Sequence, residues 1–138
     1  MSENVHQPRP KADSEKITIN LGFVDLGNID LLVREGFYSN RTDLIRTAIR
    51  NQIDRHAEAA QRSQLRSELD LGIRHFSRAD LEEAKASGVG FDINVLGLAT
   101  IASDVSAELA LSTIRSVTVL GAFHASAEVK AALADRIR

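Results

Sequence analysis

The chain has 138 residues, of which 43% are hydrophobic, and a formal net charge of −2 at pH 7. This length fits one ordinary domain or two small ones, and the apolar content is sufficient for a packed core. The absence of cysteine excludes disulfides and thiolate metal sites, and no apolar run approaches the about 20 residues of a membrane-spanning helix.

Residues 1–15 are polar and contain both prolines of the chain, Pro8 and Pro10. A segment of this composition buries too little apolar surface to fold, so we expect a disordered arm. The arm also lacks the apolar core of a secretory signal, which predicts a soluble, cytoplasmic protein.

Residues 16–21, with the sequence KITINL, alternate between polar and apolar side chains. A period of two is typical of a half-buried strand with Ile17, Ile19 and Leu21 on its inner side. No second strand follows nearby, and a single strand leaves its backbone N–H and C=O groups without partners. We therefore expect an antiparallel ribbon with the same strand of a second copy, which makes the protein a homodimer.

Two amphipathic helices are predicted directly after this strand. Between residues 25 and 35 the apolar side chains share one helical face, and Gly36 follows as a C-terminal cap. A second helix with a basic outer side includes the sequence LIRTAIRNQI. Ser39 or Asn40 can cap its start, and Asp43 stands three residues after Asn40, as in a capping box.

The order of these parts over residues 16–56 resembles the CopG/Arc/MetJ ribbon-helix-helix transcription factors. The resemblance rests on ITINL for the strand and on IDLLVREGFYSNRTDLIRTAIR for the two helices and the turn between them. It implies a dimeric β-ribbon in the major groove of double-stranded DNA, with base edges contacted by the outward side chains of Lys16, Thr18 and Asn20.

The same resemblance implies that the start of the second helix holds the DNA phosphates. The helix dipole and free backbone N–H groups favour an anion there, and the residues concerned are Ser39, Asn40 and Arg41. Members of this family often open the first helix with proline and acidic residues, whereas this chain has Gly22, Phe23 and Val24. We therefore expect the first helix to start late or to fray.

Charge alone does not mark residues 1–56 as a DNA-binding segment. They carry eight basic and eight acidic residues, so DNA binding depends on where the charges lie. We expect salt-sensitive binding with fewer phosphate contacts than a strongly basic protein makes. Some of these residues have simpler alternative roles. Lys16 could serve solely to protect an exposed strand edge, and Arg46 and Arg50 could form a solvated helix face without contacting DNA.

Residues 57–68, with the sequence AEAAQRSQLRSE, are polar and favour a helix. They are predicted to prolong the second helix as a connector to the remaining residues 69–138.

An internal repeat occupies residues 69–138. Three segments each place leucine-glycine in a short apolar run ahead of a helical pattern, with glycines 25 and 24 residues apart at Gly72, Gly97 and Gly121. Each unit predicts a strand of about seven residues and a helix of about eleven, with helix starts near Ser77, Ser103 and Ser126.

Alternating strands and helices predict a small parallel sheet with right-handed crossovers and helices on one face. The fold class is therefore α+β: a ribbon-helix-helix domain followed by a small α/β module of three strand-helix repeats. Both sides of the second and third strands are apolar, so both faces of the sheet should be buried. Since the helices cover one side, the other should meet another module or subunit and build a higher homo-oligomer.

His75 and His124 occupy equivalent places in their repeats, with Thr100 between them. In a sheet with strands about 4.8 Å apart, the two imidazoles lie about 10 Å from each other, too far to share one ion directly. We therefore predict structural histidines, no metal site and no cofactor. No nucleophile motif or phosphate-binding glycine loop is present, which predicts that the protein is not an enzyme.

Three functions remain open at this point. The first is a transcriptional repressor whose C-terminal module builds assemblies or senses a ligand. The second is the antitoxin of a toxin-antitoxin pair, although such C-terminal halves are often disordered until bound, and this one has the pattern of a folded module. The third is a structural, polymer-forming protein in which the ribbon serves only to dimerise.

Overall fold

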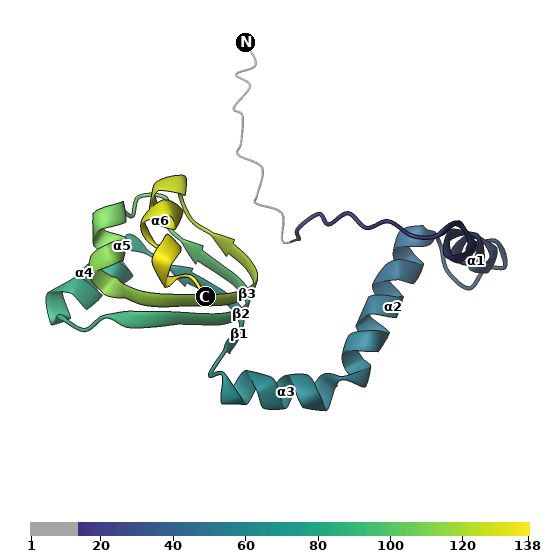
Figure 1. The fold of residues 1–138 in the computed structure, drawn as a ribbon, viewed down its shortest axis with the longest axis horizontal. Helices are drawn as coiled ribbons and strands as arrows, with labels where there is room; N and C mark the ends of the chain where they lie inside the picture. Colours follow the sequence, from purple (N-terminus) through teal and green to yellow (C-terminus); the bar gives the residue numbers. More distant parts are fainter. Residues whose placement is uncertain (1–13) are drawn as a thin grey trace, which may run out of the picture. The chain divides into compact units, whose positions relative to one another are not determined.

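The computed structural model describes residues 14–138, and the predicted arm lies outside the described residues except for its last two. The chain divides into two compact units, Met1–Gln52 and Ile53–Arg138, which are considered separately below. Figure 1 shows helices α1 and α2 in the first part of the chain, and a sheet with further helices in the second.

Helix α1 spans Phe23–Arg34, so the expected late start is wrong. Gly22 is the N-cap, in an extended conformation, and its carbonyl accepts the Leu26 N–H without any side-chain cap. The predicted cap at the other end is confirmed. Gly36 has a φ of +84°, and the N–H groups of Gly36 and Phe37 donate to earlier carbonyls of the last turn, as in a Schellman motif.

Helix α2 spans Arg41–Arg55 and begins with the predicted cap. Asn40 is the cap residue, because its Oδ1 accepts the Asp43 N–H at 2.8 Å. The Asp43 carboxylate in turn accepts the Ser39 N–H at 3.0 Å. In the usual capping box, the side chain of the third helical residue accepts the N–H of the cap residue itself. Here it accepts the N–H of Ser39, the residue before the cap.

Residues 15–22 carry no regular secondary structure in the single chain. The strand expected over residues 16–21 is therefore not formed within one copy, and Ile17 and Ile19 are exposed to 73% and 61%. A β-ladder needs a second strand, and the predicted second strand belongs to another copy of the chain. The ribbon stays a prediction.

Helix α3 spans Ala57–Arg66 and is separate from α2, so the predicted continuous connector is wrong. The backbone leaves the helical conformation at His56, where φ is −104° and ψ is 13°. The His56 N–H donates to the Ile53 carbonyl, three residues back, which tightens the last turn of α2. No residue of α3 is buried.

The predicted parallel sheet is confirmed, with strands in the sequential order β1-β2-β3. The helices after the strands pack into one core cluster with the sheet, which places them on the same face. A short 3₁₀ helix, η1, follows at Ala134–Arg136. The strands are β1 at Asp70–Phe76, β2 at Phe91–Ile101 and β3 at Ile114–His124, and the helices are α4 at Arg78–Ser87, α5 at Ala107–Thr113 and α6 at Ala127–Ala132.

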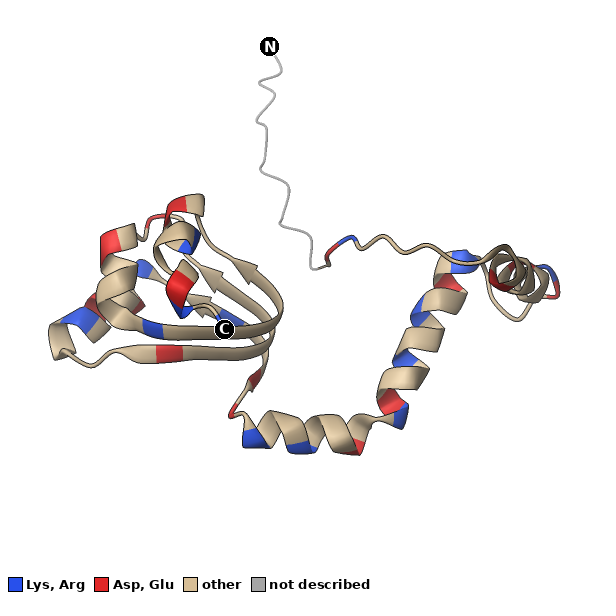
Figure 2. Ribbon diagram, in the orientation of Figure 1, with Lys and Arg blue, Asp and Glu red and all other residues tan. Residues whose placement is uncertain are grey.

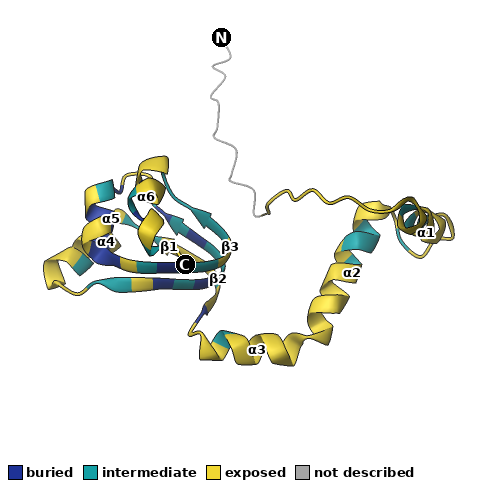
Figure 3. Ribbon diagram, viewed as in Figure 1, coloured by how far each residue is buried: buried dark blue, intermediate teal, exposed yellow. Residues whose placement is uncertain are grey.

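The core of the second unit lies between the sheet and α4, α5 and α6 (Figure 3). Alternate residues of the central strand β2 point into it, and each helix contributes apolar side chains from its inner face. The largest fully buried apolar side chains of this core are Leu81, Ile93, Val95, Ile114, Val117, Val129 and Leu133.

The three repeat glycines lie side by side in the sheet, because Gly72 pairs with Gly97 and Gly97 with Gly121. All three have positive φ, at +119°, +139° and +121°, a conformation that side chains other than glycine rarely adopt. A Cβ at Gly97 would also overlap the carbonyl oxygen of Gly72, and one at Gly121 that of Gly97. The regular spacing of these glycines in the sequence therefore reflects the same backbone bend in three neighbouring strands.

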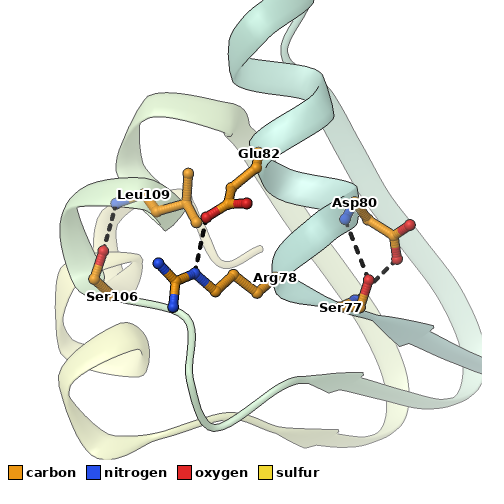
Figure 4. Close-up of polar contacts among 6 residues, drawn as sticks. All are labelled: Ser77, Arg78, Asp80, Glu82, Ser106 and Leu109. Atoms are coloured by element: carbon orange, nitrogen blue, oxygen red, sulfur yellow. Dashed lines mark hydrogen bonds and ion pairs between the residues drawn. The ribbon is translucent and has the colours of Figure 1, made fainter.

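Serine caps begin all three module helices, and two of them are those predicted. Ser77 and Ser126 each accept a hydrogen bond from the backbone N–H of the third residue of α4 and α6. The Asp80 carboxylate in turn accepts the Ser77 N–H, which completes a capping box at α4 (Figure 4). The prediction at Ser103 is wrong. The cap of α5 is Ser106, whose Oγ accepts the Leu109 N–H at 3.1 Å.

The middle repeat differs because its strand-to-helix connection is longer. Ser77 and Ser126 each stand five residues after their glycine, whereas Ser106 stands nine residues after Gly97. The additional residues form a turn in which the Val105 N–H donates to the Ala102 carbonyl, and the Val105 side chain is buried. α5 and α6 have seven and six residues, shorter than the predicted eleven.

We predict that Gly97→Ala destabilises the C-terminal module more than Gly72→Ala. Both substitutions force alanine into a strained backbone conformation, which costs about 1–3 kcal/mol. Only the Gly97 variant also places a methyl group against a neighbouring backbone carbonyl, because the space around Gly72 is open. Urea unfolding followed by circular dichroism measures both losses; equal losses would contradict the close approach of β1 and β2 at the glycines.

Candidate nucleic-acid interface

The three side chains predicted to contact bases, Lys16, Thr18 and Asn20, are all exposed in the extended segment before α1. The apolar side chains between them are exposed as well. The segment therefore presents two different sides, one polar and one apolar, and neither is covered by the rest of the single chain.

Apolar surface also remains open on α1, on α2 and in the turn between them. Neither helix has a fully buried residue, and Phe23 and Phe37 are exposed to 93% and 71%. Leu26, Ile29, Val33, Leu44 and Ile45 are only half-buried. A folded unit with this much open apolar surface requires a further apolar surface against which to pack.

The start of α2 combines two features that favour a phosphate. The backbone N–H groups of Arg41 and Thr42 lie in the first turn, where the helix offers them no carbonyl acceptor. They also lie at the positive end of the helix dipole. The N–H groups of Ser39 and Asp43, by contrast, are already bonded within the cap.

An ion pair joins α1 to the start of α2. Arg41 donates from Nε to Oδ1 of Asp30 and from Nη2 to Oδ2, both at 2.8 Å, in a two-pronged arrangement. The hydrogen bond from Arg41, with its charge, lowers the pKa of Asp30 below its ordinary value, and the same bond raises the pKa of Arg41. Both groups are therefore charged at neutral pH.

This pair changes what Arg41 can contribute to a phosphate site. Asp30 offsets the guanidinium charge and fixes its position beside the first turn of α2, while Nη1 takes no part in the pair. Arg41 is among the residues predicted from the sequence, whereas Asp30 is not. The two residues are eleven positions apart on different helices, so no periodic pattern links them.

The remaining basic residues of α2 are distributed along the helix (Figure 2). Arg46 and Arg50 are exposed on it, and acidic residues stand near both of its ends. The interface thus has separate cationic groups rather than a continuous basic patch.

The C-terminal module places the two repeat histidines in one row. His75 pairs in register with Thr100, and Thr100 with His124, so a whole strand separates the imidazoles as predicted. His75 Nδ1 lies 2.6 Å from Thr100 Oγ1. Within residues 14–138 no group of three histidine or acidic side chains is arranged to hold a metal ion, and no helix there is long and apolar enough to cross a membrane.

Residues 12–130 match the ribbon-helix-helix transcriptional regulator family. The chain belongs to this family. The resemblance found over residues 16–56 is thereby confirmed, and the match extends through most of the strand-helix repeats, which therefore form part of the family pattern. Regulators of this family dimerise and bind DNA. No curated protein and no solved structure matches the chain.

We predict that the Asp30 carboxyl titrates below its ordinary pKa and that Arg41→Gln returns it to the ordinary range. A lowered folded-state pKa means that the pair stabilises the fold above the unfolded-state pKa, and that this contribution is lost as the pH falls through the folded-state pKa. NMR titration of the carboxyl carbon measures the midpoint. Arg46→Gln, on the same helix, is the control and should leave it unchanged; an unchanged midpoint in Arg41→Gln would refute the pairing.

Proposed function

We propose that the protein is a sequence-specific transcriptional regulator, a repressor, which inserts a dimeric β-ribbon into the DNA major groove. The observation that carries the proposal is the exposed alternation of residues 16–21 directly ahead of two helices with open apolar surfaces. Pairing two copies covers the apolar side of the ribbon against those helices and leaves the polar side facing outward. Family membership supports the same arrangement.

The polar side of the ribbon has the chemistry for reading bases. A major groove about 12 Å wide admits a two-stranded ribbon. Lys16 can donate to the O6 and N7 acceptors of guanine, and Asn20 can pair with the N6 donor and N7 acceptor of adenine. The Thr18 hydroxyl can donate or accept, so it can contact guanine or adenine. A twofold ribbon presents each of these side chains twice, so we expect a palindromic operator.

The start of α2 provides the phosphate contacts that hold the ribbon in register. The N–H groups at its first turn, the side chains of Ser39 and Asn40, and the free edge of the Arg41 guanidinium are the donors. Oδ1 of Asn40 is occupied as the helix cap, which leaves its amide nitrogen for the phosphate. Because few phosphates are neutralised this way, affinity should fall with salt less steeply than for a strongly basic protein.

Repression follows from occupancy alone. A dimer in the major groove excludes other proteins from the same base pairs, and no additional activity of the chain is required. An antitoxin with the same DNA-binding head is the alternative. The folded sheet and core of the C-terminal module favour the repressor, since toxin-binding segments are often unfolded until bound.

We predict that replacing Lys16, Thr18 and Asn20 together with alanine abolishes sequence selection while the dimer persists. Each good base contact contributes about 1–3 kcal/mol of discrimination and the dimer makes each contact twice, so Asn20→Ala alone should weaken the selected site by at least about thirtyfold. Selection of bound duplexes from a random-sequence pool measures the preference, and sedimentation measures the dimer.

Lys85→Ala is the matched control, because Lys85 is an exposed lysine on α4 of the C-terminal module. It should leave both the preference and the dimer unchanged. A wild-type protein that selects no sequence, or a triple variant that selects the same one, would rule out reading by the ribbon. The first outcome would favour the structural, polymer-forming protein.

A further inference from the structure

The sheet of the C-terminal module has one face that no part of its own unit covers. Side chains alternate across a strand, so the neighbours of the core residues Val95 and Ala99 point away from the helices. The register aligns these neighbours into two apolar rows, which we call the open sheet face: Leu71, Leu96 and Leu120, and Ile73, Leu98 and Ala122.

None of these six residues belongs to the core cluster of the module. Leu71 and Ile73 are both exposed to 70% and Leu120 to 55%, while the other three are half-buried. No charged residue stands in either row. Parallel sheets are normally covered on both faces, and an open apolar surface of this kind is typical of an interaction site.

Polar rows border the open sheet face along the strands at both ends. Asn94 and Thr118 precede the leucine row on the same side of β2 and β3, and the row of His75, Thr100 and His124 follows the second apolar row. An apolar centre with a polar rim is the usual anatomy of a protein–protein interface.

The chemistry of the face restricts its occupant. Without a cationic side chain in either row, the face has nothing to attract DNA or an acidic membrane. Helix α3 is too polar to cover it, and residues 1–13 contain few apolar side chains in their sequence. An uncharged apolar surface is needed, and the open sheet face of another copy is such a surface.

We propose that the open sheet face binds the same face of a second copy about a twofold axis. The two sheets would then stack face to face, with helices on both outer sides. The ribbon dimer brings a second module to the first at high effective concentration, and this tether is the one step that rests on the proposed function.

Sedimentation velocity on the full chain tests the pairing with Leu120→Glu on β3 and Leu71→Glu on β1, the two edge strands of the sheet. Val89→Glu is the control, because Val89 is equally exposed but lies in the connection between α4 and β2. If the faces join two ribbon dimers, the wild type is a tetramer and both face variants are dimers. If they join the two chains of one dimer, both variants raise the dimer dissociation constant at least tenfold.

Either stoichiometry supports the proposal, provided that Val89→Glu behaves as the wild type does. Face variants that match the wild type in every assembly constant would overturn it. Their DNA preference in the random-pool selection reports on the ribbon separately, so a failure of the face and a failure of the ribbon are distinguishable.

A measurement on the unmodified protein covers the case in which the face variants do not fold. In methyl NMR spectra with a soluble paramagnetic probe, the methyl groups of Leu71, Ile73 and Leu120 should be shielded, and those of Val89 should be accessible. Equal accessibility of all four residues would equally overturn the proposal.

Discussion

The N-terminal unit has apolar side chains on its extended segment and on both helices, but within one chain neither helix has a buried residue. Ordering a backbone costs about 1–2 kcal/mol per residue, and burial of a large apolar side chain returns about 1.5–3 kcal/mol. Without that burial the unit cannot hold a fixed structure alone. In the proposed dimer a second copy supplies the missing surface.

The same requirement links stability to DNA recognition. In the proposed dimer, packing two copies together sets the apolar side of residues 16–21 inward and leaves the polar side outward, where we propose that it contacts bases. The ion pair between Asp30 and Arg41 joins the start of α2, where we propose phosphate contacts, to α1. The C-terminal module has its own core on one side of its sheet. Like the N-terminal unit, it also has exposed apolar side chains, which lie on the other side of the sheet.

Sequence patterns predicted those parts of the fold that depend on periodicity. The spacing of Gly72, Gly97 and Gly121 predicted three aligned parallel strands because the same backbone bend recurs in each. The start of α5 was missed, since the longer connection before Ser106 breaks the repeat, and so was the separation of α3 from α2 at His56. The contact of Arg41 with α1 lies beyond sequence patterns altogether, because it depends on how two helices cross.

Amide hydrogen exchange over residues 16–21 of the intact protein, without DNA, tests the shared ribbon most directly. An antiparallel pair bonds the N–H of every second residue to the partner strand and leaves the others to solvent. We expect alternate amides of this segment to exchange slowly, and to lose that protection on dilution below the dimer dissociation constant. Exchange of all six amides at the rate of an unstructured peptide, in a protein that sediments as a dimer, would contradict the ribbon.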